Sequence, residues 1–144
     1  MRYAIFFALC CLLMGYAALL AFDSIFHHPA DNSLVRSIND YRNLSGISAL
    51  RYDTRLACAA QAHAYEMHQM SACLEVGRRG VGARKRAEDC EYPFSEGQLL
   101  VVCQPKGAFD LLHVLKEKYH DSLLQYRYVG TAQFLTFHVV FLAN

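Results

Sequence analysis

The sequence predicts a single α+β domain in which a β-sheet lies between helical layers. The chain has 144 residues, of which 54% are apolar and 12% aromatic, so it can bury one core and is not a disordered chain. The expected elements run helix, helix, irregular segment, strand, helix, strand. The last strand is apolar on both of its faces, so the sheet should be covered on both sides.

The N-terminal segment is typical of a secretory leader. Residues 4–22 contain no charge and follow a short start whose only charged residue is Arg2. A run of 19 residues is also long enough to span a bilayer once. We therefore predict a signal peptide or signal-anchor over residues 1–22, a linker over 23–33 and a folded domain over 34–144. The domain is expected to be secreted or periplasmic, or membrane-anchored if the segment is not cleaved.

Two helices are expected at the start of the domain. The first covers 34–44, where apolar residues recur at helical spacing after Ser33, a good cap. The second covers 54–70 and is capped by Asp53. Its many alanines make it slim, so another element can pack close against it. His63 lies on its apolar stripe and is expected to be a core histidine with one hydrogen bond.

The second half of the chain has a less regular beginning. Residues 71–97 are predicted to be irregular, and the five cations within 78–86 to be a solvated loop, with an anion or lipid-headgroup contact as the alternative. A short buried strand is expected over 99–103 and a helix over 108–119. The alternating run 133–142 is expected to be a central strand. One of its faces should carry Leu135, Phe137, Val139 and Phe141.

Charge and cysteine content exclude several classes. With 14 basic and 13 acidic residues the net charge is +1, which argues against a nucleic-acid partner. Four of the six cysteines follow the leader, namely Cys58, Cys73, Cys90 and Cys103. In an exported domain they predict at least one disulfide, and the three possible pairings stay open. No short Cys-x2–4-Cys spacing is present, so a zinc site is not expected.

The opening of the domain resembles that of the CAP superfamily, which comprises the cysteine-rich secretory, antigen 5 and pathogenesis-related 1 proteins. The resemblance is greatest to the bacterial SCP-like extracellular type. The matching residues are Asn39, Arg42, Gly46, Leu50, Asp53, Leu56, Ala60, Ala64 and Met67. The segments around His120 and 128–130 resemble later family segments. The resemblance covers about 34–142 and implies a three-layer α-β-α sandwich.

The same resemblance implies a degenerate cleft. Family members usually present two histidines and two acidic residues there, often able to hold a divalent cation such as zinc. Here only His120 matches a cleft histidine, Gln98 stands where the family has a glutamate, and 71–83 holds no histidine. Glu75 is a candidate for the loop acid. We therefore name His120, Gln98 and Glu75 as cleft or ligand-binding candidates, expect a hydrogen bond between His120 and Gln98, and predict no catalytic residue, metal or cofactor.

Two functions stay open. The first is a secreted, non-catalytic binding or structural module whose partner is an unknown ligand or protein, with a lipid among the classes that the family resemblance allows. The second is a divergent hydrolase or metal-dependent protein with a rewired site around His120. A disulfide between Cys73 and Cys90, or between Cys90 and Cys103, would lock the loop and favour the first. A free Cys73 beside His120 would favour the second.

Overall fold

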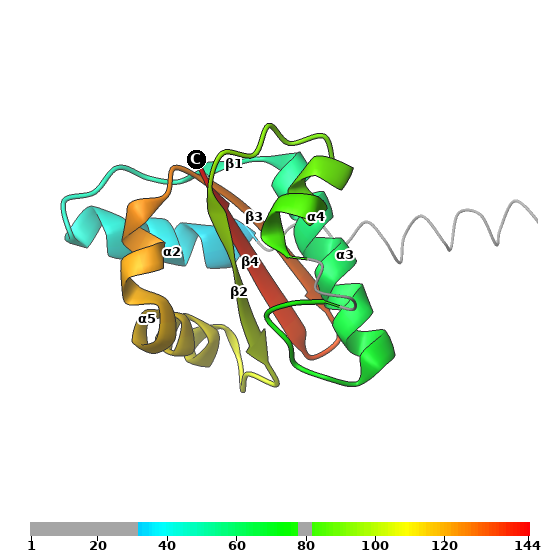
Figure 1. The fold of residues 1–144 in the computed structure, drawn as a ribbon. Coiled ribbons are helices and arrows are strands. Elements are labelled where there is room, and N and C mark those ends of the chain that lie inside the picture. The colour runs from blue at the N-terminus through cyan, green and yellow to red at the C-terminus, as the bar shows by residue number, and fades with distance from the viewer. Residues whose placement is uncertain (1–31, 78–81) are drawn as a thin grey trace, which may run out of the picture.

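The computed structural model describes residues 32–77 and 82–144. Its elements are α2 (Asn32–Leu44), β1 (Arg51–Tyr52), α3 (Thr54–Met70), α4 (Ala83–Asp89), β2 (Gly97–Cys103), α5 (Ala108–Gln125), β3 (Tyr128–Phe134) and β4 (Phe137–Ala143) (Figure 1). The predicted leader over 1–22 lies outside the described residues. Within those residues, no helix is long and apolar enough to cross a membrane.

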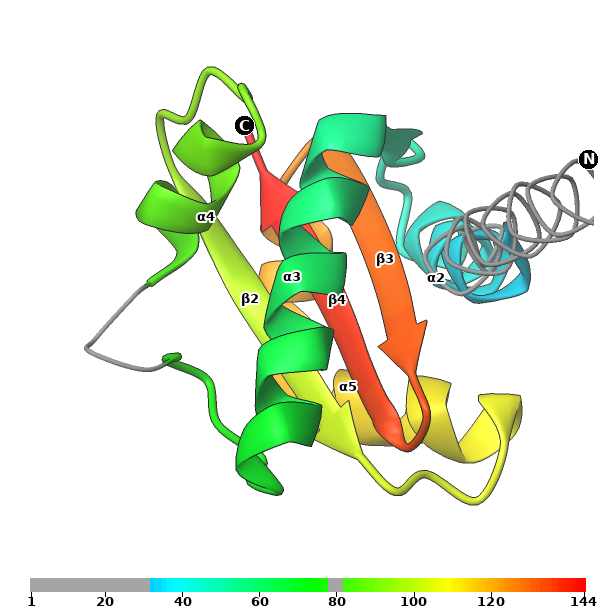
Figure 2. The ribbon, with the colours of Figure 1, turned by 90° about the vertical axis from the view of Figure 1, so that its right-hand side faces the viewer.

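The four strands form one mixed sheet in the order β1-β3-β4-β2. The short β1 pairs with β3 in parallel, and β4 pairs antiparallel with both β3 and β2. Helices α2 and α5 cover one face, while α3 and α4 cover the other (Figures 1 and 2). The predicted three-layer α-β-α sandwich is therefore confirmed, with β4 at its centre.

Alternation along β4 divides its side chains between two cores. Val140 and Leu142 belong to the core beneath α2 and α5. Val139 and Phe141 belong to the core beneath α3 and α4. All four are almost completely buried. A strand whose neighbouring side chains both enter apolar cores has to be apolar at every position, which explains the pattern in the sequence.

The alanine-rich helix α3 lets strand β3 pack close against it, as expected. A Cβ placed on Gly130 in β3 would lie 2.1 Å from the Ala57 nitrogen and 2.2 Å from the Leu56 carbonyl carbon. Both atoms belong to the backbone of α3, so neither can move aside. Only glycine lets the strand pack this tightly beneath the helix.

Two polar residues of α2 hold together the layer that α2 forms with α5. The Asn39 side chain donates to the Leu50 carbonyl oxygen at 3.2 Å and accepts from the Leu50 N–H at 2.7 Å. The buried Arg42 guanidinium donates to three carbonyl oxygens. These belong to Ser48 (2.8 Å), Leu123 (2.5 Å) and Tyr126 (3.0 Å). The two residues therefore join α2, the loop after it and the C-terminal end of α5.

Helix boundaries agree with the prediction in some places and not in others. The helix over 54–70 is confirmed, and the Asp53 carboxylate caps it by accepting from the Arg55 N–H at 2.8 Å. Helix α2 begins at Asn32, before the expected cap. Helix α5 does not end at Tyr119: the backbone turns there (φ −133°, ψ 30°) and continues as helix to Gln125.

The prediction of an irregular segment over 71–97 is partly wrong, because it contains α4. The cations of α4 are paired. Arg84 donates to the Phe94 and Ser95 carbonyl oxygens at 3.3 and 3.2 Å. Lys85 pairs with Asp89, and the buried Arg86 pairs with Glu66. Arg84 and Lys85 are thus solvated as expected but lie on a helix, whereas Arg86 is buried; Arg78 and Arg79 lie outside the described residues.

The single strand expected over 133–142 is also wrong at its beginning. Leu135 and Thr136 form the turn of a hairpin between β3 and β4. Leu135 is 65% exposed and has a φ of 51°, so it is not part of a buried face. The apolar alternation runs through the turn without Gly, Asn, Asp or Pro, and this hid the turn from the sequence.

Candidate functional site

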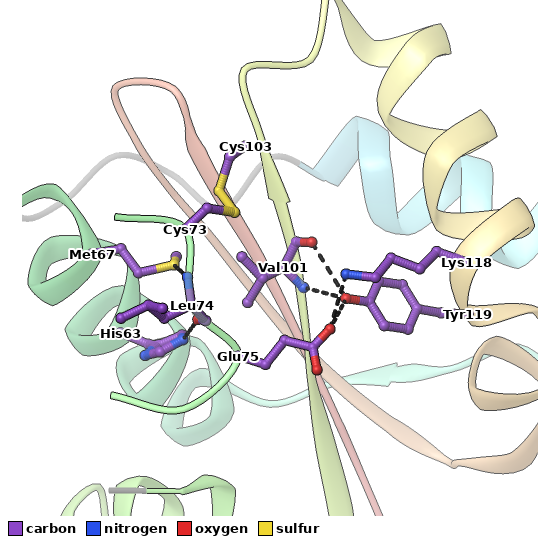
Figure 3. Close-up of a disulfide and its surroundings, with 9 residues drawn as sticks. All are labelled: His63, Met67, Cys73, Leu74, Glu75, Val101, Cys103, Lys118 and Tyr119. Carbon is purple, nitrogen blue, oxygen red and sulfur yellow. Dashed lines mark hydrogen bonds and ion pairs between the residues drawn. A yellow bond between two sulfur atoms is a disulfide. The ribbon is translucent and has the colours of Figure 1, made fainter. Parts of the chain in front are cut away.

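The loop after α3 carries the candidate residue Glu75 (Figure 3). Ser71 ends the helix in a left-handed conformation (φ 49°). Cys73 then forms a disulfide with Cys103 at the end of β2, with the two Cα atoms 6.2 Å apart. The Leu74 N–H donates to the Met67 sulfur at 3.5 Å. These contacts fix the loop immediately before Glu75.

Glu75 is held by two residues of α5. Its Oε1 accepts from the Tyr119 hydroxyl at 2.8 Å and from the Lys118 ammonium at 2.9 Å. The Tyr119 hydroxyl lies 3.5 Å from the Val101 nitrogen and 3.4 Å from its oxygen, on the edge strand β2. Loop, strand edge and α5 therefore meet at one phenol oxygen.

The protonation states at this contact complement one another. Lys118 and then Tyr119 lower the pKa of Glu75. Burial raises the pKa of Tyr119, which stays a neutral phenol. Hydrogen bonds to Tyr119 and Glu75 raise the pKa of Lys118. At neutral pH the contact thus holds one anion, one cation and one neutral donor, an arrangement suited to locking the loop in place and not to accepting a proton.

His63 of α3 holds the same loop, residues 71–77, through a hydrogen bond to Leu74. It is fully buried, and its Nε2–H donates to the Leu74 carbonyl oxygen at 2.8 Å, as expected of a core histidine with one hydrogen bond. Its Nδ1 has no hydrogen-bond partner among the described residues. Burial and then the Arg86 guanidinium lower the pKa of His63, so the imidazole is neutral.

His120 and Gln98 lie in two other contacts. The exposed His120 pairs through Nδ1 with the Tyr41 hydroxyl of α2 at 2.5 Å. Gln98 accepts from the Ser122 hydroxyl of α5 at 2.6 Å. The expected hydrogen bond between His120 and Gln98 is therefore replaced by these two. Tyr119 and Ser122 are three residues apart, so they lie on the same side of α5 and both contact β2, whereas His120 between them points toward α2.

Comparison with known proteins identifies the family. A model of the cysteine-rich secretory protein (CAP) family matches residues 35–121, more than half of the chain. The chain belongs to the CAP family. A search of curated proteins finds no match.

Solved structures share the CAP fold at low identity. An extracellular protein containing an SCP domain from Bacillus anthracis has a TM-score of 0.74 at 15% identity, covering 78% of this chain and 39% of that one. An outer surface protein from Borrelia burgdorferi has a TM-score of 0.72 at 13% identity, covering 78% and 90%. A cysteine-rich secretory protein from Staphylococcus aureus has a TM-score of 0.68 at 19% identity, covering 82% and 40%. The chain thus spans about two fifths of the first and third proteins.

The candidate residues of this CAP domain do not fit a divalent cation. Zinc needs three or four nitrogen, sulfur or anionic oxygen ligands around one point. Glu75 instead faces an ammonium group, and Gln98 and His120 are bound to separate hydroxyl groups. Across 32–77 and 82–144, no three His, Cys, Asp or Glu residues lie close enough to hold a metal ion.

The second disulfide joins Cys58 of α3 to Cys90, the residue after α4, with Cα atoms 6.1 Å apart. The predicted disulfide bonding is thus confirmed, with pairs other than the two that the sequence singled out. Cys73 is not a free thiol beside His120, but it does lock the loop.

The partner residues Tyr119, Lys118 and Ser122 were missed from the sequence. Tyr119 is buried in the core beneath α2 and α5. Its hydroxyl was the available signal, because a buried phenol needs a polar partner.

Proposed function

We propose that this chain is an exported, non-catalytic binding or structural module of the CAP family. The observation that carries the proposal is the separation of Glu75, Gln98 and His120 into three contacts, each satisfied by its own partner. Acid–base catalysis needs at least two titrating groups within reach of one substrate. The three residues therefore serve to hold the loop, β2, α2 and α5 together.

Export is supported by two independent observations. The uncharged run 4–22 predicts a leader or anchor. The two disulfides need an oxidising compartment to persist. The Bacillus and Borrelia relatives are described as extracellular and outer-surface proteins, which agrees with the same location.

The hydrolase alternative has no comparable support. A nucleophilic cysteine would have to be a thiolate, and Cys73 is bonded to Cys103. The Glu75 carboxylate is paired with Lys118 and is a poor general base for that reason.

The test compares the wild-type chain with Glu75→Gln and His120→Gln. We expect no one-to-one micromolar zinc binding by calorimetry, no turnover of ester or peptide substrates, and retained folding by circular dichroism in all three. His113→Gln is the matched control, since His113 is an exposed histidine of the same helix. Zinc binding or turnover in the wild type that His120→Gln abolishes, with folding and the control intact, would overturn the proposal.

A further inference from the structure

The turn between β3 and β4 carries an apolar cluster in which Leu135 and Tyr65 are exposed, while Phe134 and Phe137 are half-buried against the core beneath α3 and α4. Phe134 contacts Tyr65 and His68 of α3, with ring centroids 5.3 and 4.9 Å apart, and Phe137 lies 6.3 Å from His68. Leu135 completes the group at the turn, 65% exposed. We call these five residues the hairpin-tip patch. The turn lies at the same end of the molecule as the C-terminal end of α3 (Figures 1 and 2).

Leu135 is unfavourable for the fold in two ways. Its φ of 51° belongs to the left-handed region, where glycine or asparagine is the usual residue. Its side chain also gains little from burial at 65% exposure. An apolar residue that is both strained and exposed at a turn indicates a requirement other than folding.

The patch itself contains no Lys, Arg, Asp or Glu. Its polar contacts include Gln69, which donates to the Tyr65 hydroxyl at 2.6 Å, and Gln133, which donates to the Leu135 carbonyl oxygen at 3.0 Å. Moving the patch out of water therefore does not require the dehydration of a Lys, Arg, Asp or Glu side chain. It also offers no lysine or arginine to attract anionic lipid headgroups.

We propose that the hairpin-tip patch inserts into the interface of an uncharged lipid bilayer. Leu135 enters the acyl boundary, and the rings of Tyr65, Phe134 and Phe137 lie at headgroup level, where aromatic residues are favoured. The proposal rests on the proposed function of a binding module and names its partner surface.

The chain before the domain favours this partner over a second protein. The apolar run ends at Phe22 and α2 begins at Asn32, so nine residues separate them. Nine residues reach at most about 30 Å. A chain that keeps its N-terminal segment in the membrane would therefore hold the domain beside the bilayer, where a weak contact through one hairpin tip becomes effective.

The absence of tryptophan from the sequence allows a direct test with the full chain. Leu135→Trp places a single fluorophore at the tip. Leu44→Trp is the matched control, because Leu44 is 89% exposed at the end of α2, away from the turn in Figure 1. With phosphatidylcholine vesicles, we expect the Leu135→Trp emission to shift to the blue and to be quenched by brominated lipid, while Leu44→Trp stays unchanged.

Further measurements distinguish the remaining outcomes. Added phosphatidylglycerol should leave the signal unchanged. If Leu135→Trp does not fold, Thr136→Trp carries the same reporter, and adding Leu135→Asn to it should weaken insertion about tenfold. Solvent-like emission with vesicles, in a folded chain, would overturn the proposal. A blue shift without vesicles that grows with protein concentration would also overturn it, because a second copy would then cover the tip. Neither outcome bears on zinc binding or turnover, which test the proposed function separately.

Discussion

The two helical layers of this CAP domain are attached to the same sheet by different means. The layer of α3 and α4 carries both disulfides, the neutral buried His63 and the ion pair between Arg86 and Glu66. The layer of α2 and α5 has a core of aliphatic side chains with Tyr119 and Tyr126, and the Arg42 side chain donates to its backbone carbonyl oxygens.

The short length of α4 explains why its layer depends on such covalent and polar links. Helices α2 and α5 have 13 and 18 residues, enough to cover the sheet with apolar side chains. Helix α4 has only seven residues and follows a loop, so it buries little surface of its own. Covalent and polar links therefore hold α4 in place, whereas α3, with 17 residues, covers the sheet with apolar side chains as α2 and α5 do.

The largest expected effect concerns the close contact of the α3 layer. Gly130→Ala would place a methyl group against the backbone of α3, so we expect a loss of more than about 3 kcal/mol in the free energy of unfolding, or no folding. Urea denaturation measures it. Gly82→Ala is the control, because nothing lies within 4 Å of its added Cβ. Equal stability of the two variants would show that α3 does not touch β3.

The stability of the layer of α2 and α5 should depend on the hydrogen bonds of Arg42. Arg42→Met keeps the apolar stem but leaves buried carbonyl oxygens of Leu123 and Tyr126 without a donor, so we expect a loss of about 2–3 kcal/mol. Arg36→Met, at an exposed position of the same helix, should change stability by less than about 0.5 kcal/mol. A similar small effect at Arg42 would mean that apolar contacts alone hold this layer.

Acid should weaken the α3 layer first. The pKa of His63 is lower in the folded than in the unfolded chain, so between the two values only the unfolded chain binds the proton. Stability should therefore fall as the pH drops below about 6.5, the ordinary value for histidine. His63→Gln should flatten the pH dependence of stability between about pH 5 and 7, whereas the exposed His113→Gln should not. Identical slopes in both variants would contradict this.

Long periodic elements could be predicted from the sequence, and short ones could not. The 17-residue helix α3 has an N-cap and a continuous stripe, and its bounds were correct. The two-residue β1 has no period to detect, and its pairing depends on β3, far away in the sequence. Helix α4 was hidden by the glycines and charges around it. Its stability comes from Glu66 and the disulfide at Cys90, which are tertiary contacts.

The sequence predicted which residues form the candidate site but not which neighbours they contact. Glu75, Gln98 and His120 were found through their family positions, and the resemblance suggested that two of them should meet. Which neighbour each side chain reaches depends on rotation about α5 and on the backbone change at Tyr119. Such angles are set by packing between layers, which no local pattern records.

The smallest expected effect concerns Leu135, which belongs to neither core. Its substitution should raise the stability of the domain, whereas the substitutions above lower it. Asparagine tolerates the left-handed conformation better than leucine, so Leu135→Asn should raise the free energy of unfolding by about 1 kcal/mol. Thr136→Asn is the control, since Thr136 does not share the positive φ. Urea denaturation of both variants measures the gain. A loss of stability in Leu135→Asn would mean that the leucine side chain packs against the domain. A gain combined with weaker vesicle insertion would show that the leucine is kept for the membrane contact and at the expense of the fold.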